Sequence, residues 1–239
     1  MEWNRVIYAD CMNEENGLPS LEDKSIDLCF TDHPWGVEYN KKLIKTTSHF
    51  NTGRILKPKK NSIHYNDNFD FEFTIKWVNQ INRICKLTFI YTAWKLLPFW
   101  YSNFITIKGL GFIYYPNAIS RSSISHFNNY DPFIIFGKFT KHYKLHSNVY
   151  KTVKKWGFLN NEKWIHPTPK DPLLIQKILK ELHSKSVIDP FMGSGTTAEA
   201  CNKLGIPWLG YEINEVYSQD INKRLKNCRK EPQQITLKL

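Results

Sequence analysis

The sequence predicts an α/β fold in which a doubly wound, mostly parallel sheet carries helices on both faces. Strand-like and helix-like apolar runs alternate over residues 185–228, which is typical of parallel strands joined by crossover helices. Two turns rich in proline or glycine, at 31–36 and 189–197, each follow an apolar run. The chain has 239 residues, 41% of them hydrophobic. Because this suffices for one such core, we expect residues 1–239 to form a single domain.

Three strands and one helix are expected in the first part of the chain. Apolar runs predict the strands, at residues 6–9, 25–30 and 87–92. Residues 73–86 form the predicted helix, because apolar side chains recur there at every third or fourth position. Those side chains are Ile75, Val78, Ile81 and Cys85.

The middle of the chain predicts an antiparallel hairpin. Residues 111–115 and 132–136 are β-rich and near enough in sequence to pair as antiparallel neighbours. Residues 96–107, with Pro98 near their start, fit neither the strand nor the helix pattern clearly. We therefore expect the hairpin to extend a sheet that is otherwise parallel.

The last part of the chain predicts a helix followed by alternating strands and helices. Pro172 suits the first turn of the helix, where its missing N–H costs nothing. The apolar face of that helix consists of Leu174, Ile175, Ile178, Leu179 and Leu182. The elements that follow are a strand at 185–189, a helix at 196–204 closed by Gly205, a strand at 206–212 and a helix at 215–228.

The chain is basic, with a formal net charge of +11. This favours a polyanionic partner, because lysine and arginine displace counterions from phosphates, although a lysine-rich proteome would give the same balance. Residues 36–68 are polar, irregular and basic, as expected of a mobile loop. Residues 138–165 interleave lysines with aromatic residues, which is typical of a small recognition segment for nucleic acid. A solvated lysine face over core aromatics explains the second segment equally well. The candidate nucleic-acid contacts are Lys41, Lys42, Arg54, Lys141, Lys144, Lys151, Lys154 and Lys155.

Several classes of protein are disfavoured by what the sequence lacks. The five cysteines are scattered singly, which argues against a disulfide framework and against a zinc site. No apolar run approaches the roughly 20 residues of a membrane span, and the N-terminus shows no signal pattern. We expect a cytoplasmic protein without a bound metal.

Residues 187–197 predict a loop that binds a nucleotide-type cofactor. The loop reads Asp189-Pro190-Phe191-Met192-Gly193-Ser194-Gly195-Thr196-Thr197. Its glycines allow close backbone approach to a ligand, and the following helix offers free N–H groups. Glu212 ends the next strand, where an acid can accept hydrogen bonds from two ribose hydroxyls. No lysine follows the glycines as in a nucleoside triphosphate loop. The alternative interpretation is a plain strand-to-helix turn.

The turn at residues 31–36 predicts an active site for an aminated base. The exocyclic amine of adenine or cytosine is a poor nucleophile, because its lone pair is delocalised into the ring. Asp32 and a backbone carbonyl of the turn can hold the two amine protons, and Trp35 offers a face for stacking an extruded base. Chemistry of this kind depends mainly on positioning and local electrostatics. A strand-ending turn with a buried tryptophan is the alternative.

Together these segments resemble the DNA amino-methyltransferases, which use S-adenosylmethionine to methylate adenine N6 or cytosine N4. Residues 189–196 are close to the family's cofactor loop, and Asp32-His33-Pro34-Trp35 is similar to its Asp-Pro-Pro-Tyr/Phe/Trp motif. His166-Pro167-Thr168-Pro169-Lys170 resembles a His-Pro-Thr-x-Lys-Pro motif, and Tyr8-Ala9-Asp10-Cys11 resembles the family's N-terminal strand. The catalytic motif precedes the cofactor loop, as in the permuted β group.

The resemblance implies a Rossmann-like methyltransferase fold, S-adenosylmethionine as cofactor and double-stranded DNA with a flipped base as partner. The implied catalytic residues are Asp32, His33, Pro34 and Trp35. The implied cofactor-binding residues are Asp10, Thr168, Lys170, Asp189, Phe191, Gly193, Ser194, Gly195, Thr196 and Glu212. A homodimer and a role in restriction-modification are also compatible with it. His33 replaces the family's first proline, and Asp171 interrupts the Lys-Pro pair.

The leading hypothesis is a site-specific DNA methyltransferase that acts on adenine N6, which aspartate rather than serine at position 32 favours. Methylation of cytosine N4 is the close alternative. An RNA amino-methyltransferase and a non-catalytic, cofactor-binding partner subunit are the further alternatives, and the intact Asp32, Pro34 and Trp35 argue against the last of these.

Overall fold

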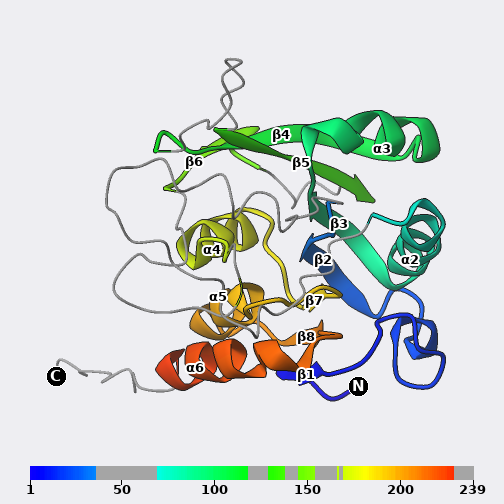
Figure 1. Cartoon of the computed structure of the whole chain (residues 1–239), viewed down its shortest axis with the longest axis vertical. Helices are drawn as coiled ribbons and strands as arrows, with labels where there is room; N and C mark the ends of the chain where they lie inside the picture. Colours follow the sequence, from blue (N-terminus) through cyan, green and yellow to red (C-terminus); the bar gives the residue numbers. More distant parts are fainter. Residues whose placement is uncertain (36–68, 118–128, 138–144, 154–165, 167–168, 229–239) are drawn as a thin grey trace, which may run out of the picture.

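The structure is a computed structural model and describes residues 1–35, 69–117, 129–137, 145–153, 166 and 169–228 (Figure 1). The strands are β1 (Arg5–Ile7), β2 (Ile26–Asp32), β3 (Cys85–Tyr91), β4 (Ile107–Tyr114), β5 (Tyr130–Gly137), β6 (Val149–Lys151), β7 (Val187–Asp189) and β8 (Trp208–Tyr211). The helices are α2 (Phe71–Ile84), α3 (Leu97–Asn103), α4 (Pro172–Glu181), α5 (Thr196–Leu204) and α6 (Ser218–Cys228). Short 3-10 turns are η1 (Leu18–Ser20), η3 (Trp94–Leu96) and η4 (Glu215–Tyr217).

The strands of the described residues form one eight-stranded sheet in the order β1-β8-β7-β2-β3-β5-β4-β6. Across the part of the sheet that runs β1-β8-β7-β2-β3, every strand is parallel to its neighbours. β5 runs antiparallel to both β3 and β4, and β6 runs parallel to β4. The predicted doubly wound, mostly parallel sheet with an antiparallel hairpin is therefore confirmed.

Helices cover both faces of this sheet, as Figure 1 shows. Helices α4, α5 and α6 pack on one face, in a core cluster that includes Leu28 and Phe30 of β2. Helices α2 and α3 pack on the other face, in a cluster that includes Ile26 and Cys29 of the same strand. Residues of β2 thus contribute to both cores, as a strand covered on both faces must.

The strand order reverses between β2 and β7. The chain leaves β2 through α2 to reach β3 on one side, and it leaves β7 through α5 to reach β8 on the other side. In open α/β sheets, ligands bind beyond the carboxyl ends of the strands at such a switch point. Asp32 and Asp189 are the last residues of these two central strands.

Several element boundaries differ from the expected ones. β1 ends at Ile7 rather than at residue 9, and a carboxylate oxygen of Asp10 accepts a hydrogen bond from the backbone N–H of Met12 at 2.9 Å. β2 continues two residues further than expected, through Asp32. The ambiguous residues 96–107 divide into α3, with a proline in its first turn, and the first residue of β4. The last helix begins as the 3-10 turn η4 before α6.

Candidate active site

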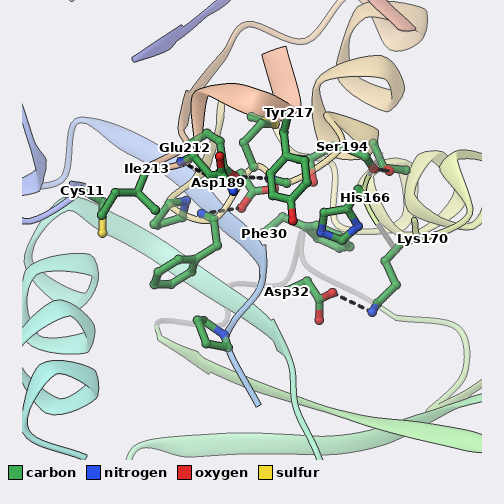
Figure 2. Close-up of a pocket in the computed structure, with 18 of the residues that line it drawn as sticks. Cys11, Phe30, Asp32, His166, Lys170, Asp189, Ser194, Glu212, Ile213 and Tyr217 are labelled. Carbon is green, nitrogen blue, oxygen red and sulfur yellow. Dashed lines mark hydrogen bonds and ion pairs between the residues drawn. The ribbon is translucent and has the colours of Figure 1, made fainter. Parts of the chain in front are cut away.

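A cavity of about 330 Å³ opens beyond the carboxyl ends of β2, β3, β7 and β8 (Figure 2). Two predicted catalytic residues, Asp32 and Pro34, line it. The predicted cofactor-binding residues that line it are Asp10, Lys170, Asp189, Phe191, Gly193, Ser194, Thr196 and Glu212. The fold thus gathers two motifs that lie more than 150 residues apart in sequence into one cavity.

The loop after β7 owes its shape to two glycines. Gly193 has φ +53, and a Cβ built there would lie 2.9 Å from Nε2 of His166. Gly195 has φ +78 and is the N-cap of α5, where a Cβ would lie 3.1 Å from Cγ1 of Ile221. Residues other than glycine rarely adopt a backbone conformation with positive φ. The backbone of the loop therefore forms the cavity wall in a way that larger residues would prevent.

Glu212 follows β8 and faces this loop. Its Oε2 accepts a hydrogen bond from the backbone N–H of Gly193 at 2.7 Å, and its Oε1 accepts one from Asn214 at 2.8 Å. Burial raises the pKa of Glu212 to about 7, although the backbone donors oppose that shift. The carboxylate is held at the cavity by two backbone contacts and retains acceptor capacity for a ligand.

Asp189 ties the two central strands together. Its Oδ1 accepts a hydrogen bond from the hydroxyl of Thr31 in β2 at 2.6 Å and another from the backbone N–H of Phe191 at 3.1 Å. Burial raises its pKa to about 6, against these hydrogen bonds. Asp189 therefore fixes the relative position of the two motifs as well as lining the cavity.

Asp32 forms an ion pair with Lys170. Lys170 Nζ lies 2.6 Å from Oδ2 of Asp32, and the two side chains are 15% and 28% exposed. The same Nζ lies 4.7 Å from the ring centroid of Trp35 and 5.4 Å from that of Tyr91. Trp35 itself packs against the core beneath this lysine. The predicted catalytic turn and the predicted third motif thus meet through the contacts of Lys170 with Asp32 and Trp35.

His33 turns away from the cavity. Its ring is 2% exposed and lies among aromatic side chains, with centroids 5.1 Å from Phe69 and 5.3 Å from Trp100. Its Nε2 lies 3.3 Å from Oγ1 of Thr74 in α2. Burial lowers its pKa to about 3, so the imidazole stays neutral. A buried ring that does not reach the cavity is badly placed for proton transfer to a substrate there.

The described residues His166 and Asp171, which lie on either side of Lys170 in sequence, both make contacts with neighbouring elements. The backbone N–H of His166 donates to Oδ2 of Asp220 at 2.8 Å, and its ring meets that of Tyr217 edge-on. Asp171 is the N-cap of α4 and accepts from the backbone N–H of Leu173 at 3.1 Å. The same carboxylate accepts a hydrogen bond from the hydroxyl of Thr152 next to β6. The residue that departs from the family motif therefore caps a helix and anchors Lys170.

Some predicted residues lie elsewhere. Neither Gly195 nor Trp35 lines the cavity: Gly195 caps α5, and Trp35 packs against the core. Thr168 lies outside the described residues, as does the whole of 36–68. Of the candidate nucleic-acid contacts only Lys151 is described, exposed on β6. Those outside the described ranges are Lys41, Lys42, Arg54, Lys141, Lys144, Lys154 and Lys155.

Sequence reasoning missed several residues that line the cavity. Tyr91 ends β3 directly beside Asp32, Phe30 lies within β2, and Ile213 and Tyr217 follow Glu212. Position at or just beyond a strand end is the signal that could have identified Tyr91 and Ile213. Within the described ranges, no cluster of potential metal ligands occurs and no helix is long and apolar enough to cross a membrane.

A family model described as DNA methylase (N6_N4_Mtase) matches residues 26–223. The chain belongs to this family. The type II methyltransferase M.HinfI of Haemophilus influenzae is 25% identical, with 98% of this chain and 71% of the relative covered. The crystal structure of the M1.HpyAVI–SAM complex has a TM-score of 0.60 at 18% identity and covers 92% of this chain and 98% of that one. The PvuII DNA methyltransferase, which is cytosine-N4-specific, has a TM-score of 0.61 at 14% identity, with coverage of 92% and 85%.

The protein is thus a β-group DNA amino-methyltransferase that depends on S-adenosylmethionine. Its cavity has features that fit this cofactor. Gly193 lines the cavity, and its backbone has a left-handed conformation (φ +53) that favours glycine, so main chain rather than a side chain forms this part of the wall. Glu212 presents a carboxylate to the same space. The exposed Ile213 adds an apolar contact at the rim.

Proposed function

We propose that this methyltransferase acts at specific sites in double-stranded DNA and methylates N6 of an adenine turned out of the helix. The observation that supports this proposal is that Asp32 and the glycine loop open into one cavity (Figure 2). Methyl transfer requires the donor methyl and the accepting amine to be held within reach of each other, and a base must leave the stack to enter such a cavity.

The cofactor side of the cavity is proposed to consist of the loop after β7 and the residues after β8. Gly193 admits the methionine part, and Glu212 accepts hydrogen bonds from the ribose hydroxyls. Asp10, in the loop that follows β1, is proposed to approach the adenine on the same side. When bound, S-adenosylmethionine supplies a methyl group on a positively charged sulfur, which is a strong electrophile.

The base side is proposed to consist of the turn after β2. Asp32 accepts a hydrogen bond from the target amine, and the backbone carbonyl of His33 accepts the second. Holding both amine protons favours a pyramidal nitrogen whose lone pair points at the donor. With the cofactor bound, the amine would take its methyl group in exchange for the bond to sulfur, and Asp32 or water would accept the proton that the methylated amine loses. Trp35 does not itself line the cavity, and its ring, which Lys170 Nζ overlies, is proposed as the stacking face for the base.

The basic segments are proposed to bind the DNA backbone. Residues 36–68 would fold over the flipped base and residues 138–165 would recognise the target, with a second copy of the chain as a further contributor. The support for this is their composition, because lysine clusters displace counterions from phosphates. Residues 36–68 lie wholly outside the described residues, and of 138–165 only 145–153 are described.

Methyl transfer from labelled cofactor to duplex DNA, single-stranded DNA and RNA tests the proposed function. We expect label in N6-methyladenine from duplex DNA. Label in N4-methylcytosine would instead support the activity for which the PvuII enzyme is named. Transfer to RNA alone, or tight cofactor binding without any transfer, would contradict the proposal.

A further inference from the structure

Lys170 contributes a cation to the side of the cavity where the target base is proposed to bind. The resemblance implied a role for this lysine toward the cofactor. Its ammonium, however, lies 2.6 Å from Asp32 and above the rings of Trp35 and Tyr91. Lys170 lines the cavity, and Figure 2 shows it reaching toward Asp32. A donor and an acceptor therefore stand side by side at the position where the base edge would enter.

Tyr91 adds a second sign that a polar ligand belongs here. It pairs in register with Asp32 across β2 and β3, lines the cavity and is 1% exposed. Its hydroxyl has no hydrogen-bond partner within the part of the chain that the structure describes. A buried polar group without a partner costs free energy. A ligand with hydrogen-bonding atoms at this end of the cavity would remove that cost.

We propose that Asp32 and Lys170 together read the two adjacent polar atoms that adenine and cytosine share, the exocyclic amine and the neighbouring ring nitrogen. The carboxylate accepts from the amine, and the ammonium donates to N1 of adenine or N3 of cytosine. Thymine, and guanine at its O6 edge, present the reverse order, a carbonyl beside an N–H. Their carbonyl would face the acceptor Asp32 and their N–H the donor Lys170, so neither hydrogen bond would form. This inference rests on the proposed function and names which bases the site admits.

The geometry of the pair suits this task. Two groups 2.6 Å apart have a spacing close to that of neighbouring donor and acceptor atoms on one base edge. Both side chains are mostly withdrawn from water, where hydrogen bonds to charged groups discriminate strongly. Asp171, directly after Lys170, caps α4, and the contact with Asp32 holds the ammonium itself in place. Donation to the ring nitrogen selects and orients the base and does not activate the amine.

The test combines Lys170→Met with a target base that lacks the ring nitrogen. Duplexes carry either adenine or 1-deazaadenine at the methylated position, or cytosine and 3-deazacytosine if label appears in N4-methylcytosine. With the wild type, the deaza base should lower kcat/KM about tenfold to a hundredfold. Lys170→Met should lower kcat/KM by a similar factor on normal DNA, and the deaza base should then cause less than about a threefold further loss.

Two further measurements separate this role from others. Lys177→Met is the matched control, because Lys177 Nζ also lies over an aromatic ring, 5.4 Å from the Tyr150 centroid, but outside the cavity. It should keep the wild-type kcat/KM. Equilibrium binding of labelled S-adenosylmethionine to Lys170→Met should stay within about threefold of the wild type. Loss of cofactor binding in Lys170→Met would mean that Lys170 binds the cofactor rather than the base, and it would overturn the proposal.

Other outcomes also overturn it, and they are distinguishable from failure of the proposed function. An unchanged or higher kcat/KM in Lys170→Met would mean that the lysine only fills the place of the base. If the deaza base lowered kcat/KM by the same factor in Lys170→Met as in the wild type, Lys170 would not contact the ring nitrogen. In both cases the wild type still methylates DNA. If the wild type transfers no label to any DNA, the proposed function and this inference fall together.

Discussion

Asp32 is the residue on which the proposed chemistry depends most directly. Its carboxylate lies at the end of β2, at the switch point, and is only 28% exposed. Water competes weakly for such a group, so its hydrogen bonds to a ligand are stronger than at the surface. The neighbouring His33 differs, because its ring is buried in an aromatic cluster on the far side of the turn.

Asp32→Ala should lower the rate of methyl transfer by at least about a hundredfold, because one acceptor for the amine is lost. Binding of S-adenosylmethionine should change less than about threefold, because the cofactor contacts are proposed to lie at β7 and β8. Transfer of labelled methyl and equilibrium binding measure the two effects. Asp23→Ala is the control, since this exposed carboxylate pairs with Arg83 away from the cavity. A near wild-type rate for Asp32→Ala would contradict the assignment.

Glu212 should make cofactor binding depend on pH near neutrality. Burial raises its pKa from 4.5 to about 7, so in the cofactor-free protein it ionises only as the pH passes 7. Ribose hydroxyls donate to the ionised form, so S-adenosylmethionine should bind more tightly as the pH rises from about 5 to 8, by at most about tenfold per pH unit. Titrations of the dissociation constant against pH measure this.

Glu212→Gln should bind the cofactor more weakly and lose that pH dependence, because the amide does not titrate. Glu215→Gln, at an exposed position in η4, should keep it. The same raised pKa means that the folded, cofactor-free protein binds more protons than the unfolded chain between about pH 4.5 and 7. The contribution of Glu212 to the free energy of unfolding therefore falls as the pH rises across that range, and it is lowest above pH 7.

At the scale of elements, α4 holds the lysine segment in place through its N-cap. Asp171→Ala should lower the free energy of unfolding by about 1 kcal/mol, because the first turn of α4 loses its side-chain acceptor. The kcat/KM for methyl transfer should also fall under conditions where the variant is still folded, because Asp171 is adjacent to Lys170. Denaturant unfolding and kcat/KM measure the two. Asp171→Ser should restore much of the stability, and an equal loss with serine would exclude capping as the cause.

Apolar patterns located the long helix α2 and also the short elements β7, α5 and β8, but they left residues 96–107 unassigned. Helix α2 repeats its apolar positions over 14 residues, and Asp70 caps it through the N–H of Phe73, so its pattern is clear. Residues 96–107 were ambiguous because α3 has only 7 residues and β4 follows soon after. Neither the helical nor the strand period repeats often enough there to be recognised.

The local parts of the site were predictable, and the parts that depend on packing were not. The glycine loop and the Asp32 turn each lie within one short stretch of sequence. The placement of Tyr91 depends on its register with Asp32 across two strands, which no local pattern reveals. Whether His33 faces the cavity or α2 depends likewise on tertiary contacts. The cation–carboxylate pair of Lys170 and Asp32 joins residues 138 positions apart in the printed sequence.

For the whole molecule, the net charge of +11 predicts binding to DNA that weakens steeply with salt. The logarithm of the association constant should fall linearly with that of the salt concentration, by about 0.9 per phosphate contact. Replacing Lys141, Lys144, Lys154 and Lys155 with glutamine should make this slope shallower. Replacing Lys177 and Lys180, which are exposed on α4, should not. Fluorescence anisotropy across a salt series measures the slopes, and a flat wild-type response would contradict the prediction.

The pairing of β1 with β8 has a consequence for how the enzyme is made on the ribosome. The first strand of the sheet finds its neighbour only at residues 209–211, after most of the chain has been synthesised. β7 likewise finds one of its two neighbours in β8. A nascent or prematurely terminated chain that stops before residue 208 therefore has no complete cofactor cradle, whatever else it has folded. The ability to modify DNA should accordingly appear late and in one step during synthesis.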